Sequence, residues 1–391
     1  MTLKNKYNLF YFIFCIVGCC MAGFVAVFLQ FKGISNTMIG VVTGIGCVSS
    51  IVLSPWLSSL IIKYEKLTAR NMLAGIYSLL AVMFAVIAFV PLPPAAVVAG
   101  YSVMYALYVG SASFPQVIAS DYMQEGRDIN FGLARGLGSA SWAITALVMG
   151  PAIDFFNPLV LAAGFIASTG CMLLLIRSMP QAETAQTGKD TGKSTVLSII
   201  KNYPIYFMVL TGYSFCLGAH SCLGTYLPGI VSRLGGSTGV YGVAVFLMAL
   251  SEMPVMAMAA KWMKKTDSLT LIAIGGFAYV IRNFTICMAP NIAMVIAGLL
   301  FQSVSYGLLT AVITYYVIYN LAPGDQVMGQ AMIGIMSSGF GSTAGNIVGG
   351  MLLDNIGMEA MFVFACAMTV IGCAVIAAAK ITDRKRKKAV I

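Results

Sequence analysis

The sequence predicts an all-α membrane protein in which twelve transmembrane helices form two pseudo-symmetric six-helix bundles. Of its 391 residues, 59% are hydrophobic and only 9% are charged, and the mean hydropathy is +0.90. A soluble domain needs far more polar surface than this composition provides. Twelve apolar runs of spanning length follow one another, and one long polar stretch divides them into two sets of six.

The first set of helices is expected within residues 1–177. Its opening run, NLFYFIFCIVGCCMAGFVAVFLQF, has about 24 residues, which is enough to cross the hydrocarbon core of a bilayer. The run lacks the small-residue cleavage site of a signal peptide, so it predicts a first transmembrane helix. The six apolar runs of this set cover 7–31, 38–62, 72–92, 95–118, 130–152 and 158–176.

A polar stretch at 178–203 follows the sixth run and predicts a cytoplasmic linker between the two bundles. The second bundle is expected at 204–380, and a basic cytoplasmic tail at 381–391. The second bundle also contains six apolar runs. They cover 204–230, 239–260, 268–288, 292–318, 326–352 and 358–379.

Basic residues are concentrated on one side of the expected membrane. With both termini in the cytoplasm, cytoplasmic segments hold nineteen of the 23 lysines and arginines, and only Lys32 and Arg233 lie outside. The positive-inside rule therefore predicts a multi-pass protein of the cell inner membrane with this orientation. The net charge of +10 reflects topology rather than nucleic-acid binding, and the tail sequence DRKRKK is expected to meet anionic lipid headgroups.

The two sets of helices also carry internal repeats. The outer glycines of GISNTMIG (33–40) recur in GGSTGVYG (235–242) after 202 positions. A proline in the helix that follows recurs after 199 positions, and an aspartate behind the fifth run recurs behind the eleventh after 200. Three matches in the same order at nearly one offset predict two related halves, the pattern of parallel-repeat transporters.

Four ionisable side chains remain deep in the expected helices: Arg135, His220, Glu252 and Arg282. An arginine at the centre of a bilayer costs about 2.5–3.5 kcal/mol on insertion scales. A charge that is retained there normally faces an aqueous cavity or a charged partner. These positions are therefore the first candidates for a functional site.

Arg135 and Trp142 are seven residues apart in the fifth run and share one helix face. The guanidinium offers five donors and the indole offers a flat apolar surface, and together they suit a polyhydroxylated ring such as a sugar. The alternative is that Arg135 forms a structural salt bridge and Trp142 only packs against its neighbours.

Glu252 needs a cation or a proton inside the membrane, and Arg135 in the opposite half is its expected partner. We therefore expect Glu252 to couple transport to protons, with a permanently ionised bridge as the alternative. His220, the single histidine, is a candidate second proton site, with a hydrogen-bonded structural residue as the alternative.

Arg282 is expected to line the same cavity from the second bundle. Gln302, twenty residues later, and Ser305, one turn further, would supply neutral hydrogen-bonding groups to this arginine or to a substrate. The alternative is that Arg282 snorkels towards the outer headgroups.

Enzymatic and metal-binding signatures are not found in the sequence. It contains no Walker loop, GxSxG or HExxH motif, and one histidine excludes a multi-histidine metal site. The ten cysteines lie in apolar runs, where a free cysteine behaves as a small hydrophobe. We expect neither an enzyme nor a resident cofactor or metal, but a transporter driven by an ion gradient.

The stretch FGLARGLGSASW resembles the fifth helix of the lactose permease and related oligosaccharide–proton symporters of the major facilitator superfamily. The resemblance implies that Arg135 and Trp142 contact a sugar. SEMP at 251–254 resembles the glutamate of the family's eighth helix, which implies that Glu252 contributes to the site, and Arg282 resembles the arginine of its proton-coupling group. A monomer that alternates access to a central cavity is the implied mode of action.

The sequence departs from that family in its coupling residues. Gln302 stands where the family has a histidine, and Ser305 stands where it has the glutamate that carries the proton. A nucleoside–proton symporter, whose fifth helix has a similar arginine, is therefore a second interpretation. A drug–proton antiporter is a third, since MGPAIDFF partly matches the antiporter element GPxxGG. A membrane sensor that binds a ligand without transporting it is a fourth.

Overall fold

The computed structural model describes residues 1–64, 67–181 and 195–390, and every regular element among them is a helix. Residues 182–194, half of the predicted linker at 178–203, lie outside the described residues. The chain forms two compact units. Unit 1 comprises Met1–Lys189 with Gly235–Phe246, and unit 2 comprises Asp190–Leu234 with Leu247–Ile391.

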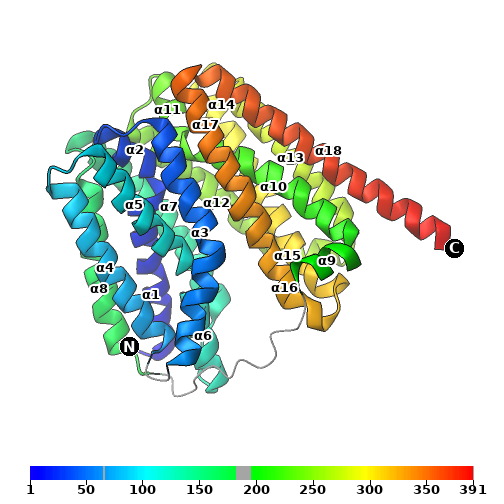
Figure 1. The fold of residues 1–391 in the computed structure, drawn as a ribbon, viewed down its shortest axis with the longest axis horizontal. Coiled ribbons are helices and arrows are strands. Elements are labelled where there is room, and N and C mark those ends of the chain that lie inside the picture. The colour runs from blue at the N-terminus through cyan, green and yellow to red at the C-terminus, as the bar shows by residue number, and fades with distance from the viewer. Residues whose placement is uncertain (65–66, 182–194, 391) are drawn as a thin grey trace. The chain divides into compact units, whose positions relative to one another are not determined.

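Unit 1 is built on α1, which packs against α7 and α8 along its length, while α3 packs on α5 and α4 on α8 (Figure 1). A π-helical turn, Cys19–Gly23, interrupts the first predicted run between α1 and α2. The helices of this unit are α1 (Leu3–Gly18), α2 (Val25–Phe31), α3 (Asn36–Lys63), α4 (Ala69–Phe89), α5 (Pro94–Gly110), α6 (Phe114–Gln124), α7 (Phe131–Phe155) and α8 (Val160–Ser178).

Unit 2 is built on α10, which packs against α18 and α17, and on α13, which packs against α18, α14 and α15. The helix α12 (Thr238–Met263) starts in unit 1 and continues in unit 2. The other helices of this unit are α9 (Val196–Asn202), α10 (Pro204–Thr225), α11 (Leu227–Arg233), α13 (Ser268–Cys287), α14 (Ile292–Leu300), α15 (Leu308–Asn320), α16 (Gln326–Gly334), α17 (Thr343–Asn355) and α18 (Met358–Val390).

Eleven helical stretches of the described chain are long and apolar enough to cross a membrane. They correspond to eleven of the twelve predicted runs. The remaining run, 326–352, is also helical, but a π-helical segment, Ile335–Ser342, separates α16 from α17. Glycines and serines are frequent in this run, which lowers its hydropathy below that of the other spans. At the C-terminus, α18 continues beyond 379 into the predicted basic tail.

The repeat seen in the sequence has a structural counterpart. Gly33 and Gly235 both occupy the left-handed region, with φ of 77° and 79°, in the turns before α3 and α12. Two residues later, the hydroxyl oxygens of Ser35 and Ser237 each accept a hydrogen bond from a backbone N–H in the first turn of the helix, both at 3.4 Å. The two turns therefore have the same conformation and the same cap.

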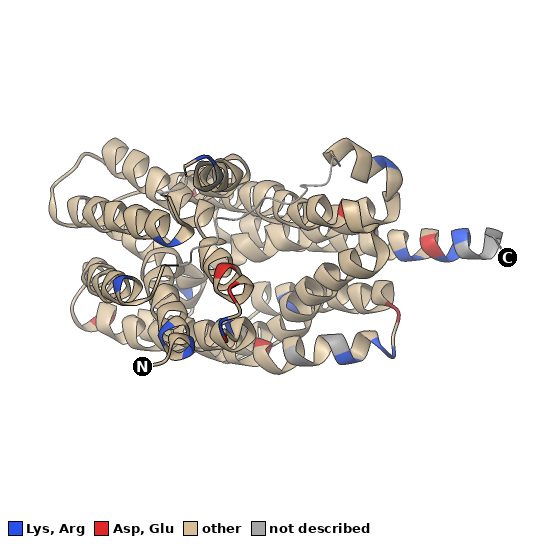
Figure 2. Ribbon diagram, turned by 90° about the horizontal axis from the view of Figure 1, so that it is seen from below, with Lys and Arg blue, Asp and Glu red and all other residues tan. Residues whose placement is uncertain are grey.

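Large apolar side chains cover the outside of the helices. Val52, Phe155 and Val363 are each at least 70% exposed, as expected for helices in contact with lipid tails. Most of the helical ribbon carries neither acidic nor basic residues, whereas the end of α18 carries a run of charges (Figure 2). This distribution agrees with a multi-pass membrane protein.

Candidate functional site

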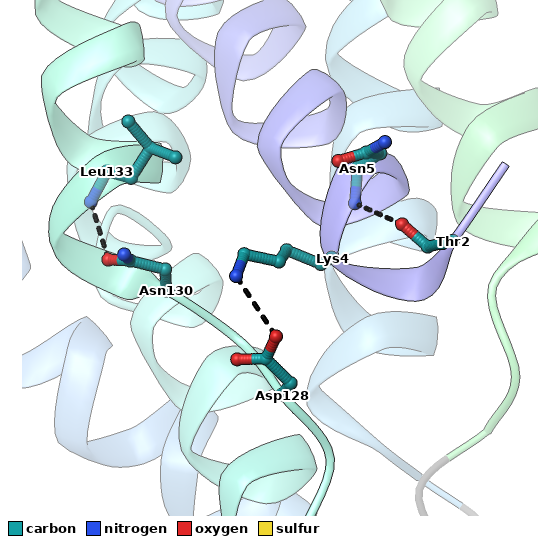
Figure 3. Close-up of polar contacts among 6 residues, drawn as sticks. All are labelled: Thr2, Lys4, Asn5, Asp128, Asn130 and Leu133. Atoms are coloured by element: carbon teal, nitrogen blue, oxygen red, sulfur yellow. Dashed lines mark hydrogen bonds and ion pairs between the residues drawn. The ribbon is translucent and has the colours of Figure 1, made fainter.

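The start of α7, which carries Arg135, is held by local polar contacts (Figure 3). The side chain of Asn130 accepts a hydrogen bond of 2.9 Å from the backbone N–H of Leu133 and so caps the helix. Beside it, the Lys4 ammonium lies 3.0 Å from the Asp128 carboxylate, which joins the start of α1 to the segment before α7. These contacts fix where α7 begins, about one turn before Arg135.

Arg135 and Trp142 both lie over α1. The Arg135 guanidinium interacts electrostatically with Tyr11 and Cys15 of that helix, and its side chain is exposed. Seven residues later, the indole of Trp142 lies against Gly18, where an added Cβ would be 3.1 Å from the ring. The glycine lets the aromatic ring approach the backbone of α1 next to the π-helical turn. No ion pair of the described chain includes Arg135.

In unit 2, Arg282 is buried in α13 with only 1% of its surface exposed. Its Nη1 donates a 2.7 Å hydrogen bond to Oδ1 of Asn283, while its Nε has no hydrogen-bond partner. The arginine therefore does not snorkel within this unit. No carboxylate of the described chain forms a direct ion pair with it, which is unusual for a buried charge.

Glu252, Gln302 and Arg282 come together within unit 2. The half-buried Glu252 carboxyl of α12 lies beside the Gln302 side chain and interacts electrostatically with Arg282. Gln302 is 2% exposed, and its Oε1 has no hydrogen-bond partner. A π-helical turn, Ser303–Gly307, follows it and separates α14 from α15. Such turns are frequent at functional sites.

Ser305 is less available to a ligand than its position in the sequence predicts. It is fully buried, and its hydroxyl donates a 2.9 Å hydrogen bond to the Phe301 carbonyl of the preceding turn. Only the acceptor capacity of this hydroxyl remains for a ligand. Its role in binding a substrate stays a prediction.

His220 of α10 is packed between two tyrosines. Its ring lies parallel to that of Tyr306, with centroids 5.3 Å apart, and edge-on to that of Tyr279 at 6.1 Å. The Nδ1 atom of His220 and the hydroxyl of Tyr279 are buried without a hydrogen-bond partner. The histidine is also close enough to Arg282 to interact with its charge.

Two residues of this cluster, Tyr279 and Tyr306, were not predicted from the sequence as site residues. Tyr279 lies three residues before Arg282 on the same face of α13, and Tyr306 lies one residue after Ser305. The spacing of Tyr279 was a usable signal, because residues three apart in a helix are neighbours. The π-helical turn changes the residue spacing around Tyr306, so a regular helical pattern does not place it.

The cluster in unit 2 combines unpaired donors and acceptors with aromatic surfaces. Arg282 Nε is a donor, Gln302 Oε1 is an acceptor, and the Tyr279 hydroxyl is both. A buried polar atom without a partner costs about 1–3 kcal/mol, so four such atoms in one cluster make it a candidate binding site. No group of three potential metal ligands occurs among the described residues. Arg135 belongs to unit 1 and Glu252 to unit 2, and their pairing stays a prediction.

Residues 4–364 match the MFS_1 like family. The chain is similar to the uncharacterized transporter YwbF of Bacillus subtilis (strain 168), at 22% identity over 65% of this chain and 63% of that protein. It is similar also to the maltose permease of Geobacillus stearothermophilus, at 23% identity over 63% of this chain and 62% of the permease. The chain thus spans less than two thirds of the length of these relatives.

Solved transporter structures share the fold at lower identity. The nucleoside transporter NupG superposes with a TM-score of 0.80 and 16% identity, covering 96% of this chain and 99% of that chain. A D-xylose-proton symporter superposes with a TM-score of 0.68 and 14% identity, covering 96% and 95%. At these identities the likeness concerns the fold alone, and it confirms the predicted all-helical membrane architecture.

Proposed function

The chain belongs to the MFS_1 like family, and on this premise we propose that it imports a small polar solute, a sugar or a nucleoside, together with protons. Membership makes it a transporter of the major facilitator superfamily rather than an enzyme. We further propose that it acts as a monomer with both termini in the cytoplasm, by alternating access of two related bundles.

The observation that carries this proposal is the buried polar cluster of unit 2. Arg282, Gln302, Tyr279 and His220 each have a buried polar atom without a hydrogen-bond partner. A solute with several hydroxyl or amide groups can satisfy both the donors and the acceptors of this set, and a lipophilic cation cannot. The aromatic rings of His220 and Tyr306 add a surface for the less polar face of such a solute.

We assign separate roles to the two units. In unit 1, Arg135 and Trp142 bind the solute, with the guanidinium as donor and the indole as a stacking surface. In unit 2, Arg282 and Gln302 supply the hydrogen-bonding groups for the solute. Glu252 is half-buried beside a charged arginine, which suits a group that gains and loses a proton during transport.

The similarity to a maltose permease and the fold shared with a nucleoside transporter support both solute classes. They are distinguished by uptake into proteoliposomes. Radiolabelled maltose, D-xylose and uridine are supplied with and without an inward proton gradient. We expect one solute class to accumulate only with the gradient. Accumulation of a lipophilic cation against its gradient, without uptake of any of these solutes, would identify an antiporter and refute the proposal.

Proton coupling is tested on Glu252→Gln. The variant keeps the size and hydrogen-bonding capacity of the side chain but cannot release a proton. We expect it to lose gradient-driven accumulation and to retain exchange of solute at equilibrium, because exchange requires no net proton movement. If the variant accumulates solute as the wild type does, Glu252 is not the proton carrier. If exchange is lost as well, Glu252 is needed for solute binding.

A further inference from the structure

A chain of three buried side chains leads from Arg282 across to α18. Nη1 of Arg282 donates to Oδ1 of Asn283 at 2.7 Å, and Nδ2 of Asn283 donates to Oγ1 of Thr369 at 2.7 Å. The Thr369 hydroxyl in turn donates to the backbone carbonyl of Ala365 at 2.7 Å. Arg282 is 1% exposed, and Asn283 and Thr369 are fully buried.

The direction of every hydrogen bond in this chain is determined. An arginine can only donate, so Asn283 must present its carbonyl oxygen to Arg282 and its amide nitrogen to Thr369. The Thr369 hydroxyl donates its proton to the Ala365 carbonyl, so the Thr369 oxygen can only accept the hydrogen bond from Asn283. The amide of Asn283 therefore has one orientation, and the guanidinium is held from one side while its Nε stays unpaired.

The partner of Arg282 in this chain is neutral. A carboxylate in the place of Asn283 would form an ion pair and cancel the charge of the guanidinium within the bundle. An amide holds the guanidinium in position and leaves its charge available to Glu252 and to a solute. A binding arginine needs a fixed position and a charge that no partner neutralises. Asn283 provides both, because its amide holds the guanidinium and is itself neutral.

We propose that Asn283, oriented by Thr369, is the positioning residue that holds the Arg282 guanidinium for the transported solute. This inference rests on the proposed function for the role of Arg282 in binding. The hydrogen-bond chain itself is independent of which solute is carried, so part of its test needs no solute.

The first test compares substitutions of two threonines in α18. Thr369→Val removes the acceptor for Asn283 and keeps the shape of the side chain, and Thr369→Ser keeps the acceptor. Thr382→Val is the matched control, because the Thr382 hydroxyl also donates to a carbonyl four residues earlier, that of Ala378 at 2.8 Å. Thr382→Val therefore removes a hydrogen bond of the same type, and Thr382 is not hydrogen-bonded to Asn283.

The reactivity of Arg282 towards phenylglyoxal, followed by peptide mass spectrometry, reports its positioning directly. We expect modification in Thr369→Val to be about fivefold faster, the factor that corresponds to one hydrogen bond of about 1 kcal/mol. Thr369→Ser and Thr382→Val should react at the wild-type rate. Equal rates in Thr369→Val and Thr369→Ser, or a wild-type rate in Thr369→Val, would overturn the inference.

The second readout is uptake of whichever of maltose, D-xylose and uridine the wild type accumulates. We expect KM to rise about fivefold in Thr369→Val and in Asn283→Asp, with the maximal rate changed less than about twofold. If Thr369→Val does not fold, Asn283→Asp tests the inference instead. A wild-type KM in the Asn283→Asp variant would refute it. If Arg282→Lys itself leaves uptake unchanged, the proposed binding site fails. In that case the labelling experiment still decides whether Asn283 positions Arg282.

Discussion

Replacing Gly345 of α17 with alanine should force α17 away from α10. The two helices cross with backbone against backbone. A Cβ at Gly345 would lie 2.0 Å from the carbonyl oxygen of Gly218, 2.6 Å from its carbonyl carbon and 3.0 Å from its Cα. These atoms belong to the helix backbone and cannot rotate away as a flexible side chain can, so the methyl group can be accommodated only by separating the helices.

The distances set the size of the effect. Ordinary contact begins at 3.4 Å, so the crossing must open by roughly 3.4 − 2.0 = 1.4 Å. Overpacking of this kind costs about 1–3 kcal/mol or somewhat more, and the better helix propensity of alanine offsets up to about 1 kcal/mol of it. A net loss of about 2 kcal/mol lowers Tm by roughly 4–8 °C in a unit of this size.

Thermal unfolding in detergent, followed by size-exclusion fluorescence, measures this shift. Gly224→Ala in the last turn of α10 is the matched control, because nothing lies within 4 Å of its Cβ position. Its Tm should stay unchanged or rise. His220 follows Gly218 by two residues, so solute uptake should also fall in Gly345→Ala. Equal Tm values for the two variants would show that this crossing is not closely packed and refute the reasoning.

Three further substitutions test other contacts. Asp154→Ala removes the carboxylate that accepts backbone N–H hydrogen bonds of 3.0 and 2.6 Å at the start of α12, and this lost cap of about 1 kcal/mol should lower Tm by roughly 2–4 °C in the same assay. Gly18→Ala would bring a methyl group to 2.5 Å from the Tyr108 hydroxyl and 3.1 Å from the Trp142 ring, so the KM for solute uptake should rise; an unchanged KM would argue against Trp142 as a binding residue. Asp128→Asn breaks an ion pair whose carboxylate is 80% exposed, so Tm should not change measurably; a clear loss would show that this pair contributes more than surface pairs do.

Much of the fold was predictable because lipid imposes a strong constraint on a spanning chain. Backbone polar groups must be paired inside the bilayer, so a long apolar run has to be helical. This argument identifies the run at 7–31 as helical, but it does not reveal the π-helical turn Cys19–Gly23 inside it. The same holds for 326–352, where the π-helical segment Ile335–Ser342 lies against α10. Such interruptions depend on contacts with neighbouring helices.

Residues of the candidate site were predictable where a single charged side chain has a high free-energy cost inside the membrane. A charge in an apolar helix is conspicuous in any sequence, and this reasoning identified Arg282 and Glu252. Tyr279 and Asn283 are ordinary residues by composition, and they gain a role only because of what surrounds them. Asn283 matters because Thr369, 86 residues away in the chain, orients its amide towards Arg282.

The sequence by itself determined that the chain is an all-helical membrane protein, which residues are charged within its helices, and which turns repeat between its halves. These properties follow from hydropathy, local spacing and glycine conformation, all of which act over a few residues. Only the tertiary structure decided that Arg282 is held by a neutral amide, that His220 stacks on Tyr306, and that Ser305 uses its proton within its own helix. Hydrogen-bond direction and ring contacts depend on segments far apart in the chain, and no local pattern records them.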